Sequence, residues 1–141
     1  MKKKILVILF ACFCGVALAL PALSLTKKES VLSTVHIYVL QTGVFNKLEN
    51  AIEQQKQYEN AIIYPDSGQY RVLVGASTKE SELKKIEKIL QEQDVHYYKK
   101  EIQVIETSDL INKYNLLLEN TEDEATIKLL NRKILERMIE I

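Results

Sequence analysis

The residue types that most often carry out chemistry are sparse in this chain and stand apart from one another. Among the 141 residues, the two histidines, His36 and His96, lie in separate strand-like stretches without a nearby pair of carboxylates at metal-ligand spacing. The sequence has no glycine loop for phosphates, no nucleophile elbow and no H-E-x-x-H motif. We therefore expect no catalysis, no metal and no cofactor.

Acidic residues are frequent, but their setting indicates solubility rather than catalysis. Glu80, Glu82 and Glu87 lie among lysines in a helix-like stretch, where i,i+4 pairing is the ordinary outcome. The 19 Lys and Arg equal the 19 Asp and Glu, and residues 2–4 hold three of the lysines, so the remainder is slightly acidic. Without a basic stripe it gains little from contact with phosphates, which argues against nucleic-acid binding.

The start of the chain predicts export. Three lysines at residues 2–4 precede 21 uncharged and largely apolar residues, 5–25, which as a helix would span about 30 Å of hydrocarbon. The lysines are expected to stay in the cytoplasm, which places everything after Thr26 outside the membrane. Because the apolar run continues to Leu25, we favour a retained single-pass anchor over residues 1–26.

Two other interpretations of this leader stay open. Residues 17–19 form an A-x-A-like site that would suit signal-peptide cleavage and secretion of the remainder. The residues before Cys12 resemble a lipoprotein signal loosely. Both cysteines, Cys12 and Cys14, lie in the apolar run, so the exported part has no disulfide and no thiolate metal site.

After a linker over residues 27–34, strand patterns alternate with helix patterns as far as residue 106. The strand patterns cover residues 35–41, 61–64, 69–75 and 95–105, and the helix patterns cover 47–58 and 79–93. The order β-α-β-β-α-β predicts a ferredoxin-like, two-layer α+β domain, with a four-stranded antiparallel sheet and both helices on one face. The other face of the sheet would be uncovered.

Polar side chains are expected on that uncovered face. Strand alternation places Gln41 with Ile37 and Val39, and Arg71 with Leu73, in the sets that point away from the helices. These two polar side chains are the first indication of a binding surface.

Residues 107–141 form a helical tail by their pattern. Apolar residues from Ile127 to Ile141 fall at helical spacing, and Thr121 with Glu124 three residues later is a capping-box sequence. Such a stripe ordinarily packs on the domain or on the other tail helix. The alternative is that it pairs with a partner protein or with a second copy of the chain.

Gly43 and Gly75, 32 residues apart, mark an internal repeat, and the stretches that contain them resemble a known family. LQTGVF (40–45) followed by Asn46, and YRVLVG (70–75), resemble the two motifs of the SPOR domain, the sporulation-related repeat of bacterial cell-envelope proteins. The resemblance covers about half of the chain, residues 35–105. It implies a ferredoxin-like fold and binding to peptidoglycan glycan strands without stem peptides, often at division or sporulation septa. Ala76–Ser77 depart from the pattern, where an aromatic is common.

The resemblance and the side-chain chemistry together predict glycan-binding residues on the open sheet face. They are Gln41, Asn46, Arg71, His96 and Tyr98. Amides donate and accept hydrogen bonds, aromatic rings offer apolar surface to sugar faces, and an arginine suits muramic acid carboxylates. Gly43, Gly75 and Phe45 are expected to be structural: backbone freedom at two turns, and a core aromatic.

Two functions from different classes follow. The first is a membrane-anchored peptidoglycan-binding module. The second is an envelope assembly protein that uses the same fold and the C-terminal helices for contacts with proteins. Sugar-compatible side chains on the open face favour the first, whereas an apolar face (Ile37, Val39 and Leu73) buried under the tail would favour the second. Which envelope process is served stays open.

Overall fold

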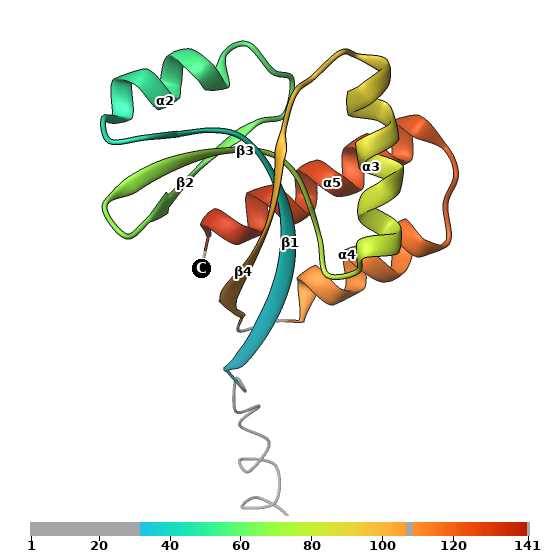
Figure 1. The fold of residues 1–141 in the computed structure, drawn as a ribbon. Coiled ribbons are helices and arrows are strands. Elements are labelled where there is room, and N and C mark those ends of the chain that lie inside the picture. Colours follow the sequence, from blue (N-terminus) through green and yellow to red (C-terminus); the bar gives the residue numbers. More distant parts are fainter. Residues whose placement is uncertain (1–31, 107–108, 141) are drawn as a thin grey trace, which may run out of the picture. The chain divides into compact units, whose positions relative to one another are not determined.

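The structure, a computed structural model that describes residues 32–106 and 109–140, contains the six elements of the sequence pattern in the predicted order (Figure 1). They are β1 (Ser33–Phe45), α2 (Leu48–Gln55), β2 (Ile62–Asp66), β3 (Gln69–Ser77), α3 (Glu80–Glu92) and β4 (Tyr98–Glu106). The tail adds α4 (Leu110–Glu119) and α5 (Glu124–Ile139). A mixed α+β fold is therefore confirmed for the described part of the chain.

The predicted membrane anchor falls within residues 1–31, outside the described residues. Over 32–106 and 109–140, no helix is both long and apolar enough to cross a bilayer.

The four strands form one antiparallel sheet in the order β2-β3-β1-β4. β1 is the long central strand, and pairs with β3 on one side and with β4 on the other. Its register with β3 shifts between Leu40 and Gln41 and again between Gln41 and Gly43. Such a bulge bends a strand and redirects its side chains, and here it lies at Gln41.

Contacts around Gly75 show which face of the sheet α3 covers. A Cβ atom at Gly75 would lie 2.8 Å from Leu40 Cδ1 and 3.0 Å from Ile86 Cγ2, so Leu40 and Gly75 face α3. Lys99, the register partner of Leu40, supports this assignment, because its Nζ lies 2.7 Å from Oε1 of Glu80 in α3.

The role predicted for the two motif glycines needs correction. Gly43 and Gly75 lie inside β1 and β3 rather than at turns, and among the described glycines only Gly68 has a positive φ, of 80°. At Gly75, glycine is required because the side chains of Leu40 and Ile86 pack closely against its backbone. At Gly43 a Cβ atom would lie 2.7 Å from the ring of Phe45, which is half-buried against the core.

The prediction of an uncovered second face is wrong for much of the sheet. Ile37 and Val39 alternate with Leu40 and so point away from α3, yet they and Leu73 are fully buried. Right-handed crossovers place α2 on the α3 side. The tail supplies the cover, since α5 contacts β3 and β2, and α4 packs on α5 (Figure 1).

The apolar stripe of the tail is therefore buried within the chain itself, as the first of the two interpretations expects. The buried residues of the stripe are Ile127, Leu130, Ile134 and Met138. Asn131, also buried, anchors the helix: its Nδ2 donates to the Val74 carbonyl at 2.9 Å and its Oδ1 accepts from the Ala76 amide at 3.1 Å. These groups lie beyond the last β2–β3 pair, so α5 satisfies the β3 edge that β2 leaves open.

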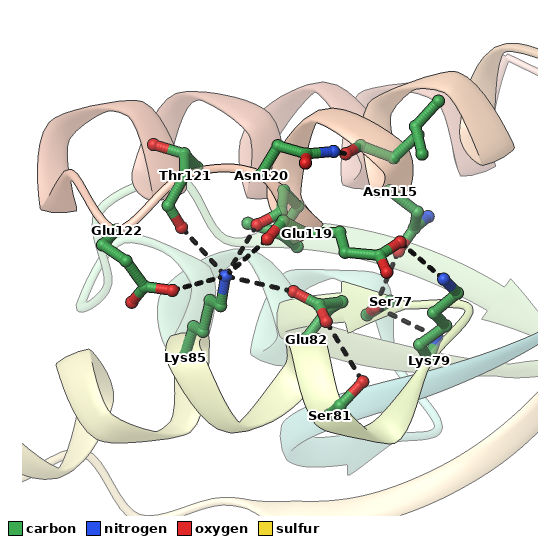
Figure 2. Close-up of polar contacts among 12 residues, drawn as sticks. Ser77, Lys79, Ser81, Glu82, Lys85, Asn115, Glu119, Asn120, Thr121 and Glu122 are labelled. Carbon is green, nitrogen blue, oxygen red and sulfur yellow. Dashed lines mark hydrogen bonds and ion pairs between the residues drawn. The ribbon is translucent and has the colours of Figure 1, made fainter.

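Lys85 of α3 joins the domain to the end of α4, as Figure 2 shows. Its Nζ donates to three main-chain carbonyls. They are those of Leu118 at 3.0 Å, Glu119 at 3.1 Å and Thr121 at 2.9 Å. It also pairs with the carboxylates of Glu122 at 3.0 Å and Glu82 at 3.3 Å, and these two partners, Glu122 first, raise the pKa of Lys85. A cation at this position satisfies carbonyls that the helix end leaves free.

The cap of α5 differs from the predicted capping box. The Asp123 carboxylate accepts from the Thr126 amide at 2.9 Å, and the bonds from Thr126 lower the pKa of Asp123. Thr121 instead accepts from the Asp123 amide at 3.3 Å. Asp is as good an N-cap as Thr and lies next to the first helical residue, so it takes the position.

Candidate functional site

Three of the predicted site residues lie together on β1, β3 and β4. Gln41 is the register partner of Tyr98, and its Oε1 accepts a hydrogen bond from Arg71 Nη1 at 2.9 Å. Directly opposed residues of antiparallel strands project from the same face. That face is the one opposite α3, because Leu40, the neighbour of Gln41, points toward α3.

Further side chains complete this group. Tyr64 is the register partner of Arg71, Asp66 accepts from Arg71, and Lys100 lies two residues after Tyr98 on the same face. We call the group the Gln41 surface; its members are Gln41, Tyr64, Asp66, Arg71, Tyr98 and Lys100.

Arg71 is held within this surface rather than presented to solvent. Its side chain is 12% exposed, and its Nε donates to Asp66 Oδ2 at 2.6 Å. Lys100 Nζ lies 3.6 Å from the same oxygen. The bond from Arg71, more than that from Ser67, lowers the pKa of Asp66. Arg71 is thus placed to position Gln41, and Lys100, 42% exposed, is the better placed of the two cations to meet an anion.

The bond from Arg71 also fixes the amide of Gln41. A guanidinium has only donors, so the Gln41 carbonyl oxygen must face Arg71 and the NH2 group must take the other position. Within the described residues that NH2 donates no hydrogen bond, and its nitrogen is not among the buried side-chain atoms without a partner. It is a donor available to a ligand.

Two tyrosines border this polar centre. Tyr98 is 74% exposed at the start of β4, and Tyr64 on β2 is half-buried. Val44, opposite Arg71 in the register, is 38% exposed. The surface therefore combines a central amide donor with apolar borders, an arrangement suited to sugar rings, which carry polar edges and apolar faces.

The remaining predicted residues do not join this centre. Asn46 follows β1, and its Oδ1 accepts a hydrogen bond at 3.2 Å from Nε2 of Gln69, the first residue of β3. His96 is exposed in the connection before β4, because that strand begins only at Tyr98 rather than at residue 95. His36 pairs with Glu101 at 2.9 Å on the α3 face of the sheet. Over the described ranges, no group of three or more His, Cys, Asp or Glu could hold a metal.

Sequence reasoning missed three members of the Gln41 surface. Lys100 was available from alternation, since it is two residues from Tyr98. Asp66 lies beyond the predicted strand 61–64, whereas β2 extends through it. The predicted strand around Tyr64 was too short to orient, and the register with Arg71 settles its face.

Comparisons with known proteins add no relative: no family model, curated protein or solved structure matches the chain.

Proposed function

We propose that this chain is a non-catalytic, membrane-anchored peptidoglycan-binding protein, whose Gln41 surface recognises glycan strands without stem peptides at the bacterial cell envelope. The observation that carries the proposal is the meeting of Gln41, Arg71 and Tyr98 on one face of the sheet. Two of the three come from the SPOR-like motifs. The ferredoxin-like assignment belongs to the same proposal, and the strand order β2-β3-β1-β4 supports it.

The chemistry of the surface suits a stripped strand. The free amide donor of Gln41 can bond to a neutral sugar oxygen, and the Tyr98 ring can lie against a sugar face. Lys100 can pair with the carboxylate of a muramic acid unit, which removal of the stem peptide uncovers.

Co-sedimentation with purified sacculi tests this function. Residues 27–141 are incubated with intact sacculi and with sacculi stripped of stem peptides by an amidase; their described elements belong to one compact unit. Binding should rise after stripping and fall with Gln41→Ala, while Gln103→Ala, an exposed glutamine on the α3 face, should bind as the wild type does. Absence of binding to both preparations would exclude glycan recognition.

One observation favours the second function, an envelope assembly protein. Ile37, Val39 and Leu73 are fully buried, and α5 contacts β3, so this half of the face is closed to a glycan. The outer sides of the tail helices also carry leucines that are more than half exposed. They are Leu116, Leu117 and Leu129.

The leucines provide a separate test. If the tail serves protein contacts, Leu116→Gln with Leu117→Gln should abolish its partner binding or self-association and leave sacculus binding unchanged. Sedimentation velocity of the wild type and of the double variant measures self-association. Together with the co-sedimentation with sacculi, it separates the two functions.

A further inference from the structure

The fixed amide of Gln41 gives the proposed site a chemical preference. We infer that the Gln41 surface selects N-acetylated glycan over de-N-acetylated glycan, because it reads acetamido groups through the NH2 of Gln41. The inference rests on the proposed function, since it names which form of the glycan that site binds.

The first support is the direction of the donor. Asp66 holds Arg71 at 2.6 Å, and Arg71 holds the Gln41 oxygen at 2.9 Å. To turn the amide around would place an NH2 against a guanidinium and lose a charge-assisted hydrogen bond. Gln41 therefore offers a donor and requires an acceptor from the ligand.

The second support is the chemistry of that acceptor. An acetamido carbonyl presents two lone pairs, as a backbone carbonyl does, and it donates nothing through that oxygen. Its methyl group is apolar, and exposed apolar surface lies nearby at Tyr98, opposite Gln41, and at Val44. An N-acetyl group thus matches both the donor and its apolar surroundings.

The third support is the charge of the surface. Arg71 and Lys100 outnumber the single carboxylate, Asp66, that pairs with both. De-N-acetylation replaces the acetamide with an ammonium, which removes the acceptor and adds a cation beside a net positive charge. Charges this close lie within the Debye length of about 8 Å at physiological salt. The hydrogen bond and the charge therefore favour the same form of the glycan.

Binding of residues 27–141 to three preparations of sacculi tests the inference. The first is stripped of stem peptides by an amidase, the second is stripped and then de-N-acetylated, and the third is the second preparation after re-acetylation with acetic anhydride. De-N-acetylation should weaken binding about tenfold, the equivalent of one lost hydrogen bond, and re-acetylation should restore it. Equal binding to all three states would overturn the inference and leave the proposed function standing, whereas absence of binding to all three would overturn both.

Two controls assign the preference to Gln41. Gln41→Glu keeps an acceptor for Arg71 but removes the NH2, so its preference for the N-acetylated form should vanish or invert. Gln103→Glu makes the same change on the α3 face and should keep the wild-type preference. The preference should also persist in 1 M salt, where the Debye length falls to about 3 Å. Loss of the preference at that salt, or an unchanged preference in Gln41→Glu, would overturn the assignment to the Gln41 amide.

Discussion

Arg71 links three strands of the Gln41 surface through its hydrogen bonds. It donates to Gln41 on β1 and to Asp66 on β2, while it lies on β3 itself. Because its side chain is 12% exposed, its contribution to a ligand is indirect. Arg71 is a positioning residue for the Gln41 amide.

Replacement of Arg71 by lysine tests this role. Arg71→Lys keeps the charge, but a single ammonium lacks the planar fork that reaches both Gln41 and Asp66. We expect affinity for stripped sacculi to fall about tenfold, the equivalent of roughly 1.4 kcal/mol. Binding isotherms measure this affinity, with Arg132→Lys, at an exposed position of α5, as the matched control. Wild-type affinity in Arg71→Lys would mean that the amide needs no such support.

Gly75 makes a second prediction at this scale, about stability. A Cβ atom at this position would lie 2.8 Å from Leu40 and 3.0 Å from Ile86, in the interior of the domain. We expect Gly75→Ala to lower the free energy of unfolding by about 1–3 kcal/mol, measured by urea denaturation, because overpacking strains a core. Gly68→Asn is the control: φ is +80°, nothing lies within 4 Å, and Asn tolerates this conformation, so the loss should be smaller.

At the scale of elements, the order of strands and helices was predictable because each has its own period along the sequence. The extent to which the tail covers the second face of the sheet was not predictable. Ile37 and Val39 belong to the same alternating set as the polar Gln41, and one polar member suggested an exposed set. In the structure that set is divided along β1: its first part is buried, and Gln41 beyond it is only half-buried. Periodicity reports which residues share a face and cannot report how far another element extends over it.

Lys85 carries the element-scale prediction, because it holds α4 against α3. Lys85→Met keeps the apolar stem and removes the ammonium from three carbonyls and two carboxylates. We expect a loss of about 1–3 kcal/mol in unfolding free energy and faster amide hydrogen exchange in α4. Lys84→Met, at the exposed neighbouring position, should leave both unchanged. Equal exchange in the two variants would show that apolar packing alone holds α4.

At the scale of the whole molecule, the candidate site was partly predictable. Alternation and the motif resemblance identified Gln41, Arg71 and Tyr98, which the register brings together. The links among them depend on side chains from different strands, such as Asp66 on β2, and no local pattern fixes a contact between strands. The tail, which lies outside the motifs, also limits the site. It covers the rest of the sheet face opposite α3, so only the end of that face around Gln41 is accessible to a ligand.

Removal of the tail therefore tests whether the SPOR-like part is a domain by itself. A chain of residues 27–106 would expose Ile37, Val39 and Leu73, which are fully buried in the presence of α4 and α5. Each such side chain is worth about 1.5–3 kcal/mol when buried, and a domain of this size has a total stability of only about 5–15 kcal/mol.

We accordingly expect residues 27–106 to lack a cooperative urea transition and to show poor dispersion in a 1H–15N correlation spectrum, whereas residues 27–141 should unfold in one step. A truncated chain that unfolds cooperatively and still binds stripped sacculi would mean that the tail is an appended element. In that case its contacts with β3 through Asn131 would be dispensable for the fold. If residues 27–106 fail to fold, as we expect, the tail is part of the domain. The SPOR-like part and the tail then together determine the extent of the Gln41 surface.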